Sequence, residues 1–348
     1  MVKTALITIW MGGNFPEWFP LWVRSASLNP EFDYYVVTDR EWTWDISNIH
    51  YISMNLKEAE SVFEKVIGMK ICLKTPYKLC DYKPVWWAVI GEAINDYDYW
   101  GHIDTDVIYG NLSKFLTEDL LGDHTKIFEQ GNLTIYKNTE EIRNIYKKSA
   151  LKDNMAYSYK KAFRTNWACY FDEYMGMNLL GDKYFKVLRD QLTENYIQDF
   201  SWQHLNFTSY ITKEDFIFKW DNGHLFRYIV DGEGRLKTDE TGKLIVKEFL
   251  LCHIQKRRME IVSELKDDFA DITNISEFWI IPNKFTVKEP EGALYTEKDK
   301  VEYEELIRVK DKQRQIANMK RNGIFSYIPH RLRTKKIVGY IRKEKGFF

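Results

Sequence analysis

Short apolar runs alternate with segments of helical spacing along the first 110 residues of the chain. The clearest predicted strands are Thr4–Trp10, Phe32–Thr38 and Ile49–Met54, and the segments Trp18–Leu28 and Leu56–Gly68 have the apolar spacing of amphipathic helices. A chain that alternates in this way packs its helices on a largely parallel sheet. The sequence therefore predicts an α/β fold with a mixed, mostly parallel sheet and helices on both of its faces.

Glycine and acidic residues follow three of the predicted strands. Gly12 and Gly13 come after the first strand, Asp39 comes after the second, and Asp104 and Asp106 come after a later aromatic strand. In open parallel sheets, ligands bind beyond the carboxyl ends of the strands. We therefore expect these residues to line one rim of the sheet.

Asp104 and Asp106 lie two residues apart, directly after a strand predicted over Tyr97–Ile103. On an extended chain such residues point to the same face. Two carboxylates held close together repel each other unless a cation lies between them or one is protonated. Oxygen ligands suit a divalent metal, which in turn often holds phosphate oxygens. Asp-x-Asp pairs also occur in helix caps and surface turns, but the buried character of the preceding strand favours metal binding here.

His253 lies near the end of another apolar run, Phe249–Ile254, and is followed by Lys256, Arg257 and Arg258. A neutral imidazole could complete a metal site with the two aspartates. The cations that follow could then face the same phosphates. The alternative is a hydrogen-bonded histidine of the core.

Lys78, Asp81 and Lys83 lie at the start of a helix predicted over Lys83–Asn95, with Pro84 in its first turn. Because a helix N-terminus attracts anions, Lys78 or Lys83 could bind a diphosphate, and Asp81 could cap the helix or accept from a sugar hydroxyl. A capped surface helix is the alternative.

Asp172 and Glu173 stand among aromatic residues, between Phe171 and Tyr174. Such surroundings raise the pKa of a carboxyl group. Either carboxylate could therefore take a proton from an acceptor hydroxyl as a general base. A solvent-facing helix would explain the same residues.

Composition narrows the class of protein further. The formal net charge of −1 argues against a general nucleic-acid binder, and the 16% of aromatic residues fits either a sugar or nucleotide ligand or an aromatic core. The four cysteines have no CxxC spacing, which is typical of reduced thiols in a cytoplasmic protein. No apolar segment approaches the length of a membrane span. The basic, amphipathic run 331–348 could contact an anionic membrane, or form a solvated helix face or a partner contact.

The later part of the chain is more mixed. A strand pair is predicted over Lys126–Tyr136 around Gly131, a hairpin over Phe226–Phe249, and charged helix beyond Pro290. We expect one large domain over 1–285, with a donor half of about residues 1–112 and an acceptor half of about residues 113–285. A charged helical extension over 286–348 would follow it.

Two segments of this chain carry a family resemblance. Residues 77–84 read Tyr-Lys-Leu-Cys-Asp-Tyr-Lys-Pro, and residues 100–110 read Trp-Gly-His-Ile-Asp-Thr-Asp-Val-Ile-Tyr-Gly. Together with the order of strands, loops and basic residues over about residues 1–260, they resemble the GT-A-fold, nucleotide-sugar-dependent glycosyltransferases. The likeness is to bacterial enzymes of capsule, lipopolysaccharide and other surface-glycan synthesis. It implies a Rossmann-like nucleotide-binding fold.

The resemblance also implies a donor site. Asp104 and Asp106 would bind Mn²⁺ or Mg²⁺ that bridges the donor diphosphate, with His253 as a further ligand. Thr105, Asp81 and Lys83 would also belong to the donor site. Lys256, Arg257 or Lys78 would stabilise the negative charge of the leaving nucleotide diphosphate. The loop from Trp10 through Gly12 to Gly13, with Asp39, would hold the base and ribose. Asp172 or Glu173 would be the acceptor-side base if the enzyme inverts configuration.

The sequence thus predicts a metal-dependent enzyme that transfers a sugar from a nucleotide-diphosphate sugar to a glycan hydroxyl, in particular a lipid-linked one, at the inner face of the cytoplasmic membrane. One alternative is a nucleotidyltransferase that acts on a sugar phosphate. The loop Met11–Pro16 has no lysine, which counts against that class. The other alternative is a non-catalytic carbohydrate-binding protein.

Overall fold

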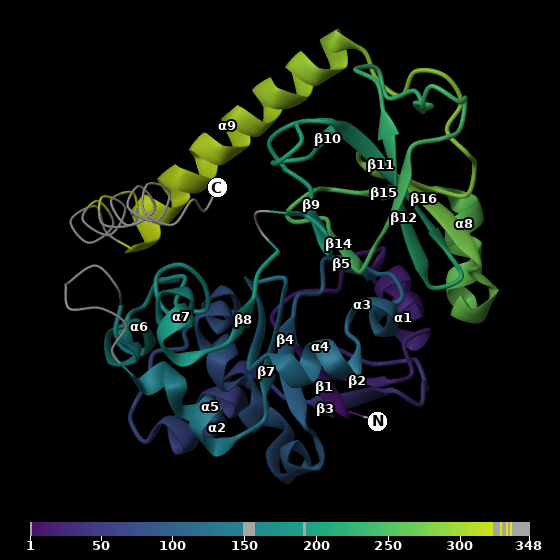
Figure 1. Cartoon of the computed structure of the whole chain (residues 1–348). Coiled ribbons are helices and arrows are strands. Elements are labelled where there is room, and N and C mark those ends of the chain that lie inside the picture. Colours follow the sequence, from purple (N-terminus) through teal and green to yellow (C-terminus); the bar gives the residue numbers. More distant parts are fainter. Residues whose placement is uncertain are drawn as a thin grey trace.

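The computed structural model describes residues 2–148, 157–190 and 193–322, together with Ile328, Leu332 and Lys335. Within these residues the strands form two seven-stranded sheets and a three-stranded sheet between them (Figure 1). The first large sheet and its helices form the lower body in Figure 1, and the second large sheet lies above it.

The first sheet is mostly parallel, as predicted. Its order is β3-β2-β1-β4-β7-β6-β8, and the pairs among β3, β2, β1 and β4 are all parallel. The strands are β1 (Thr4–Trp10), β2 (Phe32–Thr38), β3 (Ile49–Ser53), β4 (Tyr99–Ile103), β6 (Lys126–Gln130), β7 (Leu133–Lys137) and β8 (Val187–Leu188). The antiparallel pair β6–β7 is the one predicted around Gly131. The prediction of a mixed α/β fold is therefore confirmed.

Helices cover both faces of this sheet because alternate side chains of its strands point to opposite sides. Leu6 and Tyr34 pack in one core with α1 (Phe19–Ser27). Ile7 and Val37 pack in a second core with α2 (Leu56–Ile67) and η1 (Pro76–Asp96).

The capping box of α2 is a local determinant of the fold. Asn55 accepts hydrogen bonds from the backbone N–H groups of Lys57 and Glu58, and the Glu58 carboxylate accepts from the N–H of Asn55. Gly68 ends the helix at a φ of 76°. These contacts satisfy N–H groups that have no partner within a helix.

Asn55→Ala should lower the free energy of unfolding by about 1 kcal/mol, because it removes this cap. Urea denaturation followed by circular dichroism measures the loss. Lys57→Ala, a change at an exposed side chain of the same turn, should cost less than about 0.5 kcal/mol. Equal losses in the two variants would show that the cap contributes nothing.

The helix predicted over Lys83–Asn95 differs from the observed one. A 3-10 helix, η1, begins at Pro76, so Pro84 lies inside it and not in its first turn. The helix is interrupted at Gly91, which has φ 59° and ψ −132°. The sequence pattern placed the start at the second proline because Pro76 and Pro84 are equally acceptable at a first turn.

The second large sheet was not predicted beyond its hairpin. Its order is β13-β12-β11-β16-β17-β15, with β10 beside β11, and all of its pairs are antiparallel except β15–β17. The strands are β10 (Phe207–Thr208), β11 (Asp215–Asp221), β12 (His224–Val230), β13 (Val246–Phe249), β15 (Glu260–Ile261), β16 (Glu277–Ile281) and β17 (Lys284–Thr286). The predicted hairpin corresponds to β12 and β13.

The three-stranded sheet lies between the two large sheets (Figure 1). Strand β14 (Leu251–His253) pairs antiparallel with β5 (Val107–Tyr109) and parallel with β9 (Ile197–Asp199). This sheet places the end of β14 beside the segment that follows β4.

The other helices are short, except the last. They are α3 (Leu112–Phe115), α4 (Glu118–Asp123), α5 (Glu140–Asn144), η2 (Ile145–Lys147), α6 (Tyr159–Arg164), η3 (Met177–Leu180), α7 (Gly181–Tyr184), α8 (Ser263–Asp267), η4 (Asp268–Ala270), η5 (Ile272–Asn274) and α9 (Glu297–Asn322). Helix α9 confirms the charged helix predicted beyond Pro290. The basic run 331–348 lies outside the described residues, apart from Leu332 and Lys335. Among the described helices, none combines the length and the apolar character that crossing a bilayer requires.

Candidate functional site

Asp104, Thr105 and Asp106 connect β4 to β5 at the carboxyl edge of the first sheet. The backbone holds this connection from both sides: Asp104 N–H donates to the Asn132 carbonyl at 3.1 Å, and Ile254 N–H donates to the Asp106 carbonyl at 2.8 Å. Thr105 is buried, whereas both aspartates remain partly exposed. The turn therefore presents two carboxylates at the strand ends where ligands bind in such sheets.

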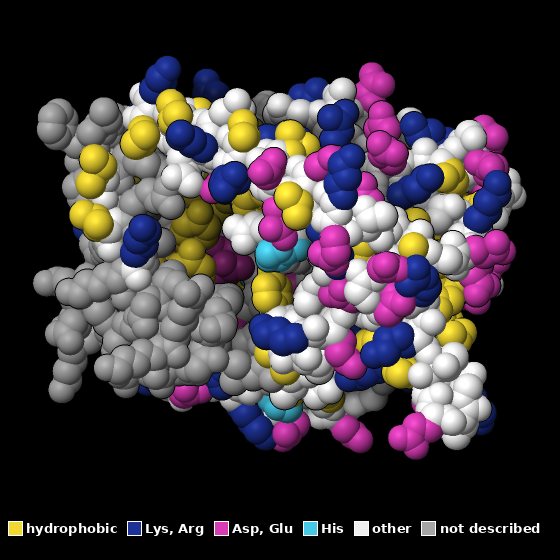
Figure 2. Space-filling model, turned by 90° about the horizontal axis from the view of Figure 1, so that it is seen from above, with side chains coloured by type: hydrophobic (Ala, Val, Ile, Leu, Met, Phe, Trp, Pro, Cys, Tyr) yellow, Lys and Arg dark blue, Asp and Glu magenta, His cyan; other side chains and the backbone are white. Residues whose placement is uncertain are grey.

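His253 meets these carboxylates. One oxygen from each of Asp104 and Asp106 and one imidazole nitrogen of His253 all lie within 4.8 Å of one another, and Nε2 of His253 is 3.2 Å from Oδ1 of Asp106. We call Asp104, Asp106 and His253 the acid–histidine cluster. Seen from above, the molecule has a hollow with apolar and acidic side chains at its floor (Figure 2).

Asp199 orients the imidazole, a contact that the sequence did not reveal. It pairs with His253 across β9 and β14, and its Oδ1 lies 2.5 Å from Nδ1 of His253. Burial disfavours the charged imidazole, but Asp106 and Asp199 outweigh it and raise the pKa of His253. With Nδ1–H donating to Asp199, Nε2 is the nitrogen that faces Asp106, which is the arrangement of a metal-ligating histidine held by an outer carboxylate.

The donor set fits a divalent cation such as Mn²⁺ or Mg²⁺. Carboxylate oxygens suit both ions, and an imidazole nitrogen is also a ligand for transition metals. The amide of Asn132 lies beside the same histidine, 3.2 Å from its Nδ1. The amide oxygen of Asn132 is buried and, within the described part of the chain, accepts no hydrogen bond.

Lys83 links the cluster to the second predicted acidic pair. Its Nζ lies 2.8 Å from Oδ1 of Asp104 and 3.5 Å from Oδ2 of Asp172, and it donates to the Gly131 carbonyl at 2.8 Å. Burial lowers the pKa of Lys83, but Asp104 and Asp172 outweigh it and raise that pKa. Since an ammonium has three donors, all of them are directed at protein groups.

Asp172 and Glu173 are brought close to the cluster through Lys83. Burial raises the pKa of both carboxyl groups, although Lys83 acts in the opposite direction. Glu173 accepts from the Gly131 N–H at 2.7 Å. A Cβ on Gly131 would stand 2.5 Å from Oε1 of Glu173 and 3.1 Å from Nζ of Lys83, so a larger residue would displace these side chains.

Lys78 and Asp81 lie in the interior instead of facing the cluster. Nζ of Lys78 is 2.5 Å from Oδ2 of Asp81 and also donates to the carbonyls of Ala162 and Trp167. The Asp81 carboxylate accepts from the backbone N–H groups of Cys169 and Phe171. Lys78 therefore has no free donor for a diphosphate in this arrangement.

The loop after β1 and the residue after β2 meet, as the rim prediction requires. Gly12 N–H lies 3.2 Å from both carboxylate oxygens of Asp39, and Trp10 Nε1 donates to the Gly13 carbonyl at 2.9 Å. Gly12 has a φ of 77°, which favours glycine. The hydrogen bond from Arg40 is the main cause that lowers the pKa of Asp39.

The basic residues after His253 divide into two kinds. Arg257 is buried and donates to the carbonyls of Ser201, His204, Leu205 and Asn206. Its guanidinium is thus committed to holding the segment after β9. Lys256 is exposed and forms no ion pair within the described residues.

Fold and site together define an α/β protein with an acid–histidine cluster at the carboxyl edge of a mostly parallel sheet. The chain belongs to a family of unknown function, DUF6625, whose profile matches residues 6–289. No curated protein sequence matches it.

Two similar solved structures are glycosyltransferases. The galactosyltransferase LgtC, solved with donor and acceptor sugar analogues, has a TM-score of 0.37 and 10% identity, over 83% of this chain and 98% of LgtC. The apo form of GlyE from Streptococcus pneumoniae TIGR4 has a TM-score of 0.29 and 14% identity, over 55% of this chain and 46% of GlyE. At these TM-scores the likeness assigns no activity to this chain.

Proposed function

We propose that this protein is a metal-dependent glycosyltransferase that moves a sugar from a nucleotide-diphosphate sugar to a glycan hydroxyl. The convergence of Asp104, Asp106 and His253 within 4.8 Å at the ends of parallel strands carries the proposal. Such a cluster holds a divalent cation and leaves coordination positions for phosphate oxygens.

Asp104, Asp106 and His253 would hold Mn²⁺ or Mg²⁺, and the bound ion would supply positive charge to the departing nucleotide diphosphate. Asp199 would keep the imidazole in the ligating orientation by accepting from Nδ1. Lys256 is the exposed cation three residues beyond His253 and would face the diphosphate. Lys83 would hold Asp104 in place from the opposite side.

The donor nucleotide would lie along the rim formed by Trp10, Gly12, Gly13 and Asp39. This rim belongs to the carboxyl ends of β1 and β2, which neighbour β4 in the sheet. On the acceptor side, Glu173 is the better placed of the two acids to act as base, because it is partly exposed whereas Asp172 is buried. Burial raises the pKa of Glu173, which makes its carboxylate a better proton acceptor.

The finer parts of the proposal concern the acceptor and its location. The acceptor would be a bacterial surface glycan of the capsule or lipopolysaccharide kind, in particular a lipid-linked one at the inner face of the cytoplasmic membrane. The basic run 331–348 would then contact anionic lipid. Removing 331–348 should weaken binding to vesicles of phosphatidylglycerol, and unchanged binding would remove the membrane contact from the proposal.

A screen of nucleotide sugars with Mn²⁺, followed by release of free nucleotide, tests the reaction. Release of uridine or guanosine diphosphate from one donor, dependent on an added glycan, supports the proposal. Release of pyrophosphate would instead identify a nucleotidyltransferase. If no nucleoside diphosphate raises the melting temperature more with Mn²⁺ than with EDTA, the metal–diphosphate site is wrong.

Asp199→Asn should weaken Mn²⁺ binding about 10- to 100-fold, because the carboxylate that orients His253 loses its charge while its shape is kept. Titration with Mn²⁺ followed by electron paramagnetic resonance measures the free ion directly. Asp267→Asn, at an exposed residue of α8, is the matched control and should bind as the wild type does. Unchanged affinity in Asp199→Asn would mean that His253 is not a ligand.

A further inference from the structure

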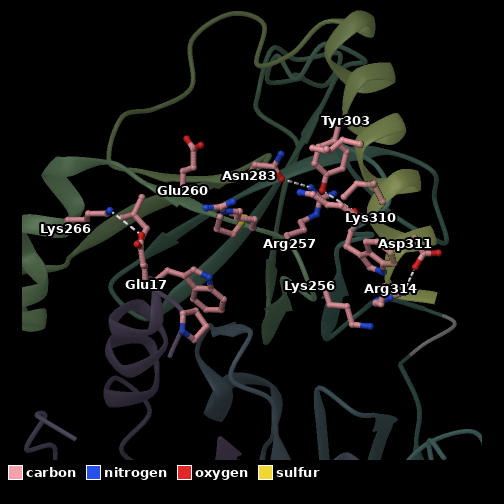
Figure 3. Close-up of a pocket in the computed structure, with 18 residues that line it drawn as sticks. Glu17, Lys256, Arg257, Glu260, Lys266, Asn283, Tyr303, Lys310, Asp311 and Arg314 are labelled. Carbon is pink, nitrogen blue, oxygen red and sulfur yellow. Dashed lines mark hydrogen bonds and ion pairs between the residues drawn. The ribbon is translucent and has the colours of Figure 1, made fainter. Parts of the chain in front are cut away.

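A groove separates α9 from the segment that follows His253. It has a volume of about 1110 Å³ and opens between the β14–β15 connection, the start of α1 and one side of α9 (Figure 3). Its lining comprises Pro16, Glu17, Trp18, Trp202, Lys256, Arg257, Arg258, Met259, Glu260, Ile261, Lys266, Asn283, Tyr303, Leu306, Ile307, Lys310, Asp311 and Arg314. The groove thus draws on segments that are up to about 300 residues apart in the sequence.

The groove is basic. Six lysine or arginine side chains line it against three acidic ones. Lys266 pairs with Glu17 at 3.3 Å and Arg314 pairs with Asp311 at 2.5 Å. The third acidic residue, Glu260, points away from Lys256 and Lys310 (Figure 3).

Three cations remain available to a ligand. Arg257 is committed to backbone carbonyls, but Lys256, Arg258 and Lys310 are exposed and make no ion pair with any described residue. Three unpaired cations in one groove attract an anion that carries several charges. Arginine in addition binds carboxylate and phosphate in a bidentate way.

Aromatic side chains accompany these cations. The half-buried ring of Trp202 has Lys256 Nζ 6.0 Å and Arg314 Cζ 5.0 Å from its centre. Tyr303 on α9 donates to the Trp202 carbonyl at 3.1 Å and so fixes the helix against this wall. Flat rings stack on the apolar faces of sugars, whereas a simple counter-ion site needs no rings.

Lys256 connects the groove to the acid–histidine cluster. It lines the groove and stands three residues after His253. Burial and Arg314 lower the pKa of Lys256, while Asp106 acts in the opposite direction. Lys256 is thus the lining residue of the groove that lies nearest to the cluster along the chain.

We propose that this groove binds an acidic oligosaccharide, with sugar rings against Trp202 and carboxylate or phosphate groups on Arg258 and Lys310. This oligosaccharide would be the acceptor of the transfer, and that assignment rests on the proposed function. The binding itself does not depend on the proposed function. Acidic glycan and anionic lipid head groups share this chemistry, so the test includes both.

The binding test compares three oligosaccharides by tryptophan fluorescence at 50 mM and 200 mM NaCl: a hexamer of galacturonic acid, a hexamer of glycerol phosphate and neutral maltohexaose. One of the acidic hexamers should bind more tightly than maltohexaose, and its affinity should fall as salt rises. Arg258→Gln/Lys310→Gln should weaken that binding about tenfold. Arg308→Gln/Lys312→Gln removes the same charge from residues of α9 outside the groove and should leave the affinity unchanged.

Several outcomes would overturn the inference. These are equal binding of acidic and neutral hexamers, equal losses in the two double variants, or binding only to phosphatidylglycerol vesicles.

Asp106→Asn separates the inference from the proposed function. It should keep the affinity for the acidic hexamer, whereas Arg258→Gln/Lys310→Gln should keep the Mn²⁺-dependent stabilisation by nucleotide. If nucleotide with Mn²⁺ does not stabilise the wild type, although the wild type binds the acidic hexamer, only the proposed function is contradicted.

Discussion

The Asp106→Asn variant should release nucleotide from a sugar nucleotide about 10²- to 10³-fold more slowly than the wild type in the presence of Mn²⁺. The substitution keeps the shape of the side chain but removes one of the two carboxylates that would hold the cation. Burial is the main cause that raises the pKa of Asp104, and repulsion from Asp106 adds to it; the substitution removes that repulsion. The protein should therefore stay folded while its response to metal disappears.

Two measurements check this result. Single-turnover release of nucleoside diphosphate gives the rate, and thermal unfolding with Mn²⁺ or EDTA gives the metal response. In wild type, Mn²⁺ with a nucleoside diphosphate should raise the melting temperature, and in Asp106→Asn the shift should vanish. Asp45→Asn, at an exposed residue after β2, is the matched control. A variant that turns over at the wild-type rate would exclude the cluster as the metal site.

Lys78→Met should lower the free energy of unfolding by about 3–5 kcal/mol. Lys78 is 1% exposed and Asp81 is fully buried, and their charged atoms are 2.5 Å apart. Methionine keeps the length of the side chain but leaves the Asp81 carboxylate without a counter-charge in the interior. The loss is large because the hydrogen bonds from the backbone N–H groups of Cys169 and Phe171 do not replace a counter-charge for a carboxylate that is shielded from water.

Urea denaturation of Lys78→Met, Asp81→Asn and the double variant measures this coupling. The double variant should be less destabilised than the sum of the single variants, because removing both charges leaves no isolated one. The experiment also separates two roles of Lys78. If Lys78 bound the diphosphate, Lys78→Met would weaken nucleotide binding with little change in stability. If Lys78 is instead part of a structural ion pair, the variant would lose stability while nucleotide binding stays the same. Additive losses would contradict the ion-pair explanation.

The first half of the fold was predictable because its signals are local. β1 and β2 have the predicted bounds, and α2 ends at the predicted glycine, since each is set by the periodicity and end residues of one short segment. The second large sheet was mostly missed. Some of its strands pair with strands far away along the chain, as β11 does with β16. A short apolar run does not specify such a distant partner.

The candidate site was predictable only in part. Asp104, Asp106 and His253 were chosen for their residue types and positions near strand ends, and the structure brings them together. Their role as metal ligands stays a prediction. Asp199 was missed because its strand, Ile197–Asp199, is too short to give a pattern, and its partner His253 is 54 residues away.

The sequence by itself determined the α/β alternation and the placement of Asp39, Asp104 and Asp106 after strands, because these follow from covalent order and side-chain periodicity. The tertiary structure alone decided which lysine faces the acid–histidine cluster. Lys78 and Lys83 look equivalent along the chain, yet Lys78 pairs with Asp81 inside the protein while Lys83 reaches Asp104. Tertiary structure also assembled the contact between Asp199 and His253. Such contacts depend on how distant segments pack, and no single segment carries that information.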